Sequence, residues 1–177
     1  MPLRAHPIWL PRIFLNIFRF PLAHAYTPID FTQAAELYGK VGGFACLKAL
    51  IERLRTDFGR DKTLLLDGGD TWQGSGTAYW TRGQGMVEAC NLLGVDIMPG
   101  HWEFTYQDSE VLASIAKFNG EFLAHNIRVK EDVLFEGAGA YDEDTGHAFQ
   151  PYTVKELGGF RVAVIGQAFP YTPLVKP

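Results

Sequence analysis

The central part of the chain has a helical pattern of apolar positions followed by a continuous apolar run. Over residues 44–58 the apolar side chains recur at steps of three and four, which predicts an amphipathic helix with Gly59 as its C-terminal cap. The apolar run Leu64–Leu66 follows and predicts a strand that is buried on both faces. This part of the chain is therefore expected to supply one helix and one strand of a layered α/β structure.

The same alternation of helix and strand continues toward the C-terminus. Residues 83–93 predict a helix, 95–98 a short strand, 109–118 a helix capped by Asp108, and 121–128 a third strand. The short spacing between these elements favours a predominantly parallel sheet with helices packed on it. The core positions expected in the helix over 109–118 are Val111, Leu112, Ile115 and Phe118.

Two β-rich segments near the C-terminus surround a pair of glycines. Residues 152–157 and the run Arg161–Gly166 lie on either side of Gly158-Gly159, which predicts a β-hairpin. The second strand is apolar enough to be expected in the centre of a sheet. Residues 129–147 are polar and are expected to form a surface connection around a short strand at Val133–Phe135.

Composition excludes several classes of protein. With 177 residues and 47% apolar side chains, the chain is expected to bury one core. The net charge of −4 and the scattered Lys and Arg residues argue against nucleic-acid binding. No apolar run reaches the roughly 18 residues of a membrane span. Cys46 and Cys90 lie on the apolar sides of predicted helices, so that two buried free thiols are expected.

Acidic and imidazole side chains stand where two of the predicted strands end. Asp67 and Asp70 come after Leu64–Leu66, and His101 comes after the strand over 95–98. Loops at the carboxyl ends of strands converge on one crevice in open α/β sheets, and ligands bind there. A carboxylate and an imidazole are ligands for first-row metals by type. Turn formation and capping remain the alternative interpretation of the same residues.

Two segments carry a resemblance to a known family. DGGDTWQG at 67–74 and GHWEFTY at 100–106 resemble loops of the calcineurin-like metallophosphoesterases of the 5′-nucleotidase type. Within that superfamily, the GHWEF variant and the segments around both loops are most similar to the SoxB-type thiosulfohydrolases of bacterial sulfur oxidation. The resemblance extends from about residue 24 to residue 177 and leaves 1–23 as a poorly defined segment. It implies an α/β fold of βαβ units, with a mixed sheet flanked by helices, of which this chain holds an incomplete domain.

The resemblance also implies a centre with two divalent metal ions, which are manganese in this branch. Asp70 takes the place of the carboxylate that bridges both ions, and His101 takes the place of an Asn ligand of the nucleotidases. Asp67 is expected to stabilise a turn away from the metal, and Glu103 is expected to orient the His101 loop. A set of Asp and His ligands does not by itself distinguish manganese from zinc or iron.

The side chain at position 102 affects which leaving group a hydrolytic site of this type could serve. Nucleotidases have a His there, and an indole cannot donate a proton at neutral pH. Trp102 therefore favours a sulfur leaving group, which needs less help than an alkoxide. The residues expected to line a substrate path or to support the ligands are Trp72, Gln73, Asn126, Trp80 and Tyr106, with core packing as the alternative for the aromatic ones.

The function implied by the resemblance is hydrolysis of the sulfone group from a cysteine S-thiosulfonate on the SoxYZ carrier protein, with release of sulfate. The alternatives are a 5′-nucleotidase-like phosphohydrolase and a non-catalytic remnant that binds an anion or a protein arm. The family is periplasmic, although no twin-arginine export signal is found here. The family's Asp-x-His and Gly-His-x-His motifs are not found either, so the chain is expected to hold about half of the domain and to be inactive on its own.

Overall fold

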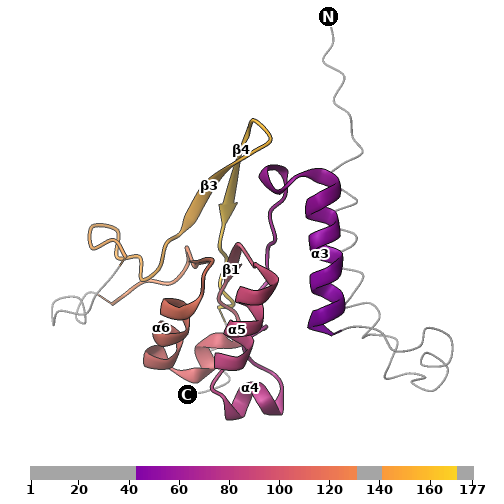
Figure 1. Ribbon diagram of the computed structural model, residues 1–177. Helices are drawn as coiled ribbons and strands as arrows, with labels where there is room; N and C mark the ends of the chain where they lie inside the picture. Colours follow the sequence, from indigo (N-terminus) through magenta and orange to yellow (C-terminus); the bar gives the residue numbers. More distant parts are fainter. Residues whose placement is uncertain (1–42, 131–140, 171–177) are drawn as a thin grey trace, which may run out of the picture. The chain divides into compact units, whose positions relative to one another are not determined.

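The computed structural model describes residues 43–130 and 141–170 (Figure 1). The chain divides into two compact units, Met1–Cys46 and Leu47–Pro177, and the second contains nearly all of the described residues. The elements are α3 (Phe44–Phe58), η1 (Arg60–Lys62), α4 (Gly76–Trp80), α5 (Gln84–Leu93), β1 (Ile97–Pro99), η2 (Trp102–Tyr106), α6 (Asp108–Lys117), β2 (Glu121–Leu123), β3 (Tyr152–Leu157) and β4 (Phe160–Ile165).

Parallel pairing organises the centre of the second unit. β1 and β2 pair in parallel, with Met98 opposite Phe122. Leu66 forms a parallel bridge to Ile97 on the other side of β1. The predicted alternation of helix with parallel strand is therefore confirmed, and the loops that follow Leu66 and β1 leave the sheet at the same edge.

The predicted strand over Leu64–Leu66 is wrong in extent and in burial. Only Leu66 pairs as a strand residue, and its side chain is 36% exposed. The backbone hydrogen bonds between this segment and the sheet are made to the side of β1, for example from the Asp67 amide to the Ile97 carbonyl at 3.0 Å. The segment therefore lies at an edge of the described sheet, where an apolar run is not enclosed from both sides.

The hairpin prediction is confirmed, but its central position is wrong. β3 and β4 pair antiparallel around Gly158 and Gly159, which both have positive φ and so suit a two-residue turn. Among the described residues β4 pairs with β3 alone, and Phe160 and Ile165 are 75% and 66% exposed. Apolar composition predicted a strand correctly here, but it could not predict which neighbours cover that strand.

One predicted core position of α6 is also wrong. Leu112 is 54% exposed, whereas Ser114 is buried and accepts a hydrogen bond from Gln84 of α5 at 2.8 Å. Val111 and Phe118 are buried as expected. The core-facing stripe is therefore narrower than apolar content alone suggested, and a polar pair joins the two helices within it.

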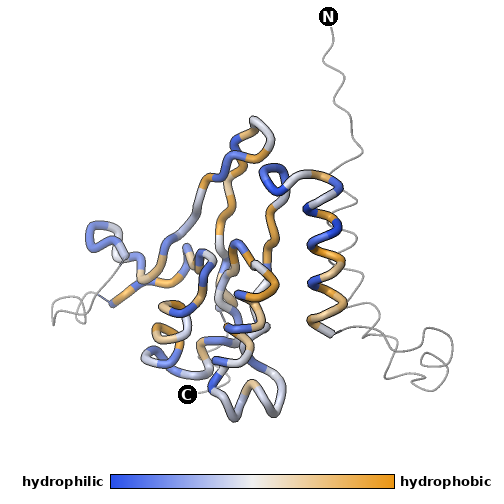
Figure 2. Tube along the Cα trace, viewed as in Figure 1, coloured by the Kyte–Doolittle hydropathy of each residue, from blue (hydrophilic) through white to orange (hydrophobic). Residues whose placement is uncertain are grey.

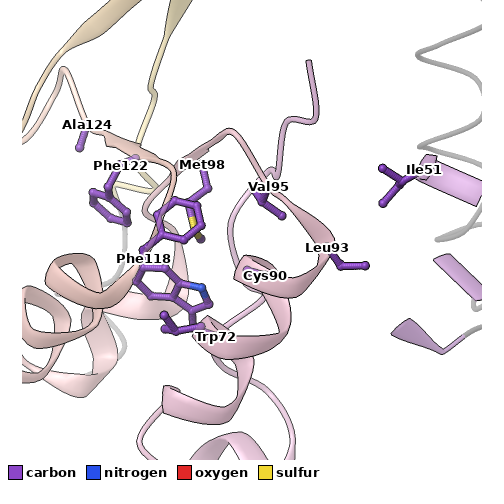
Figure 3. Packing of buried hydrophobic residues seen from close by; sticks show 11 residues of the cluster. Ile51, Trp72, Cys90, Leu93, Val95, Met98, Phe118, Phe122 and Ala124 are labelled. Atoms are coloured by element: carbon purple, nitrogen blue, oxygen red, sulfur yellow. The ribbon is translucent and has the colours of Figure 1, made fainter. Parts of the chain in front are cut away.

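The core gathers around Trp72, Cys90 of α5 and the aromatic residues Phe118 and Phe122 (Figure 3). Figure 2 shows the apolar residues of α3 interrupted by hydrophilic ones along the helix, as its periodicity predicts. Cys90 is a buried free thiol, as expected, whereas Cys46 is exposed and that prediction was wrong. The predicted strand at Val133–Phe135 lies outside the described residues.

A buried guanidinium attaches α3 to the sheet. Arg55 donates to the Gly94 carbonyl at 2.7 Å and to Asp96 Oδ2 at 3.0 Å, and its side chain is 10% exposed. Asp96 Oδ2 also accepts from the Leu65 amide at 2.7 Å. One ion pair thus joins the helix, the end of α5 and the segment before the Asp67 turn.

Across the described residues, no helix is both long enough and apolar enough to cross a membrane.

Replacing Arg55 by Met is expected to lower the free energy of unfolding by about 2–3 kcal/mol, because the carbonyls and Asp96 lose a charged donor. Arg53→Met is the matched control, since the side chain of Arg53 is 80% exposed and its Nε lies 3.6 Å from Oδ2 of Asp57, which is also exposed. It is expected to cost less than about 1 kcal/mol. Urea unfolding of both variants tests this, and equal losses would contradict the role of Arg55.

Burial raises the pKa of the Cys90 thiol to about 12. In a Cys46→Ser chain, Cys90 is therefore expected to react with a disulfide reagent at pH 8 only as fast as the fold opens, because the thiolate is the nucleophile. Unfolding in urea should restore the rate of an ordinary thiol. Rapid labelling of the folded chain would show that the core around Cys90 is not closed.

Candidate metal centre

Two loops form the site, and each follows a parallel segment of the sheet. Asp70 lies in the loop after Leu66, and His101 lies in the loop after β1. Asp70 Oδ1 is 2.8 Å from His101 Nδ1 and accepts a hydrogen bond from the Trp102 amide at 3.2 Å. The side chains of Asp70 and His101 are 53% and 30% exposed. The structure therefore brings the two predicted metal ligands together at an accessible edge of the sheet.

The backbone of the first loop has an uncommon conformation at Asp70 itself. Asp70 has φ 69°, in the left-handed region, which Asp tolerates better than most residues but which still requires support. Gly69 before it packs so closely on the second loop that an added Cβ would lie 2.7 Å from the Cβ of His101. Only glycine permits this close approach of the two loops.

A buried carboxylate ties the loops to each other. Glu103 is fully buried, and its Oε2 accepts from the His101 amide at 2.7 Å while Oε1 accepts from the Trp72 amide at 3.3 Å. Burial raises the pKa of this carboxyl, and the hydrogen bonds from backbone amides oppose the shift. Glu103 thus connects the loop of Asp70 with the loop of His101 through main-chain donors.

Asp67 supports the turn of the first loop. Its Oδ1 accepts from the Gly69 amide and from the Thr71 hydroxyl, both at 2.9 Å. Burial raises the pKa of Asp67, and these hydrogen bonds act in the opposite direction. Its contacts are those of a turn-stabilising carboxylate.

The aromatic residues expected along a substrate path divide into buried and exposed ones. Trp72 is 1% exposed and stacks on Phe122 in the core, and Tyr106 is 6% exposed, so neither presents a surface to a ligand. Trp80 is 80% exposed on α4. Gln73 is partly buried, and its Nε2 donates to the Thr105 hydroxyl at 3.4 Å. For Trp72 and Tyr106 the core alternative is therefore correct.

A third segment of the chain, which was not predicted from the sequence, also reaches the site. The ring of Phe169 stacks on His101 with centroids 4.3 Å apart, and on Trp102 at 5.8 Å. The Phe169 amide also donates to the Gly100 carbonyl at 3.2 Å. The available signal was an aromatic residue shortly after a predicted strand, but no periodicity distinguishes it from a core residue.

Asn126 positions this third segment through hydrogen bonds to Ala168. Its Nδ2 donates to the Ala168 carbonyl at 2.9 Å, and its Oδ1 accepts from the Ala168 amide at 2.8 Å. A two-way amide bond of this kind fixes the backbone next to Phe169. Asn126 therefore contributes to the site through the position of the aromatic ring.

The donor chemistry of the site fits a divalent first-row metal in part. Asp70 and His101 supply an oxygen and a nitrogen donor in contact with each other. Within residues 43–130 and 141–170 no group of three or more His, Cys, Asp or Glu side chains is arranged to hold a metal ion. The described residues thus provide two candidate ligands, and a metal centre needs more than two.

Comparisons with known proteins agree with the fold. No protein-family profile matches the chain. Over 85% of its own length, the chain is 31% identical to a 5′-nucleotidase of Rattus norvegicus. Over 76% of its own length, it is 30% identical to a snake venom 5′-nucleotidase of Gloydius brevicauda. These matches indicate that the chain is of the 5′-nucleotidase-type calcineurin-like phosphoesterase class. Its fold is the α/β fold of that class.

Among solved structures, the chain resembles SoxB. The Thermus thermophilus sulfate thiohydrolase SoxB, determined in complex with glycerol, matches with a TM-score of 0.69 and 36% identity over 84% of this chain. The match covers 26% of SoxB, and the two nucleotidases are covered to 25% and 22%. The chain therefore spans about a quarter of the length of these relatives.

Replacing Glu103 by Gln is expected to lower the free energy of unfolding by about 1–3 kcal/mol, because an amide offers one acceptor where two backbone donors need one each. Glu110→Gln is the control, since the side chain of Glu110 is 34% exposed and faces Arg82 at 3.4 Å. It should change stability by less than about 1 kcal/mol. Equal effects in urea unfolding would show that Glu103 does not connect the loops.

Proposed function

We propose that this chain carries part of a two-metal hydrolytic centre of the SoxB type, with Asp70 and His101 as two of its metal ligands. The observation that supports the proposal is the 2.8 Å contact between Asp70 and His101 at the edge of the sheet, with Trp102 immediately beside it. The 36% identity to SoxB supports the same assignment. Residues 24–177 are proposed to be the part of the domain that this chain contains.

The residues of the chain have separate tasks in this proposal. Asp70 and His101 hold divalent metal, proposed to be two manganese ions in the whole centre, and Glu103 keeps the two ligand loops together. When bound, the cations supply Lewis acidity and positive charge for an anionic substrate. Phe169 and Trp102 shape the apolar side of the site next to the ligands.

Trp102 determines which leaving group the site can serve. The proposed reaction attacks the terminal sulfur of a cysteine S-thiosulfonate with water, so that sulfate is released and both electrons of the broken S–S bond remain on a cysteine persulfide. A thiol has a pKa of about 8.5, far below the value of about 15.7 for water. A sulfur anion therefore leaves without a proton donor, and the indole of Trp102 can occupy the position next to His101.

The partner and the compartment follow from the same proposal. The cysteine S-thiosulfonate is proposed to be presented by the SoxYZ carrier protein, and the reaction is proposed to take place in the periplasm.

A nucleotidase-like phosphohydrolase is the second candidate, because the two 5′-nucleotidases are 30–31% identical to this chain over the matched residues. The relative rates on a thiosulfonate and on a nucleoside monophosphate separate the two candidates.

The test compares sulfate release from a cysteine S-thiosulfonate peptide with phosphate release from adenosine monophosphate, in the presence of manganese. The protein that carries these residues is expected to prefer the thiosulfonate. Trp102→His is expected to raise phosphate release by ~10²-fold or more, because it supplies the missing proton donor. The proposal fails if the unchanged protein hydrolyses the nucleotide faster than the thiosulfonate.

A further inference from the structure

We infer that Tyr106 is a positioning residue for Asp70 and acts through the main chain of Trp72. The proposal rests on the site described above, but it does not depend on which substrate that site takes. Tyr106 lies at the end of η2 and is 6% exposed. Its hydroxyl donates to the Trp72 carbonyl oxygen at 3.0 Å, in a buried hydrogen bond between the two ligand loops.

The bond reaches Asp70 through a single peptide plane. The Trp72 carbonyl and the Gln73 amide belong to the same planar peptide unit. At the other end of that unit, the Gln73 amide donates to the Asp70 carbonyl at 3.4 Å. The hydroxyl of Tyr106 therefore fixes the orientation of the plane that closes the turn beginning at Asp70.

This restraint matters because Asp70 has a backbone conformation that needs support. Its φ of 69° persists only where contacts around it define the chain path. Glu103 holds the Trp72 amide, and Phe118 and Phe122 hold the indole, but among these contacts only Tyr106 orients the carbonyl.

Glycine at position 83 leaves room for the bond. An added Cβ at Gly83 would lie 3.2 Å from the Trp72 carbonyl oxygen and 3.3 Å from Cε2 of Tyr106, at a φ of 81°. Gly83→Ala therefore crowds both partners of the same hydrogen bond. Two independent substitutions can thus disturb the Tyr106 contact without altering Asp70 or His101.

The first test follows the site in the metal-free chain by NMR. Tyr106→Phe keeps the ring and removes the hydroxyl, and it is expected to shift the Trp102 amide and the His101 ring nitrogens, which contact Asp70. Ser114→Ala is the control, because it removes another buried hydroxyl, the one that accepts from Gln84 between α5 and α6. Circular dichroism confirms folding of each variant.

The inference is supported if Tyr106→Phe moves these signals and Ser114→Ala does not. It is overturned if Tyr106→Phe leaves them in place, or if Ser114→Ala moves them equally. Should Tyr106→Phe fail to fold, Gly83→Ala takes its place, with the same two outcomes.

The second test uses Mn²⁺ alone as the probe. The Mn²⁺ concentration that half-broadens the His101 signals is expected to rise about 10-fold in Tyr106→Phe, as for other residues that orient metal ligands, and to stay unchanged in Ser114→Ala. An equal concentration in all three proteins would overturn the inference. If Mn²⁺ broadens none of them, the proposed metal function fails, and the metal-free comparison decides the role of Tyr106.

Discussion

A carboxylate with no exposure to solvent holds the two ligand loops together, and the geometry of the site depends on it. Glu103 is buried at a cost that only hydrogen bonds can offset. Its partners are main-chain amides, one at His101 and one at Trp72, so the contact restrains the backbone of both loops. Separating the loops would take the Trp72 donor away from the buried carboxylate, and the unsatisfied oxygen makes that separation costly.

Parallel pairing decides where these loops meet. Because of the bridge between Leu66 and Ile97, both loops start at the same edge of the sheet. The close approach of Gly69 to His101 then brings the two loops into contact. Phe169 then covers the His101 ring from a segment that follows β4. The site is thus assembled from three separate parts of the chain, each placed by main-chain contacts as much as by side chains.

The sequence predicted the alternation of helices with parallel strands, and it singled out Asp70 and His101, because periodicity and strand-end position are local properties. Burial was harder to predict, since it depends on neighbours far along the chain. Trp72 and Tyr106 are aromatic residues next to the site, and their side chains are buried in the structure. The apolar strand β4, in contrast, is largely exposed. Phe169 could not be predicted because its contact with His101 spans 68 residues, from position 101 to position 169.

The most direct measurement of the central claim is the anomalous scattering of manganese from a crystal of the protein grown with Mn²⁺. A peak is expected within about 2.0–2.4 Å of an Asp70 carboxylate oxygen and of a His101 ring nitrogen. A peak elsewhere, or none beside Asp70 and His101 at saturating Mn²⁺, would contradict the assignment of these two residues as metal ligands.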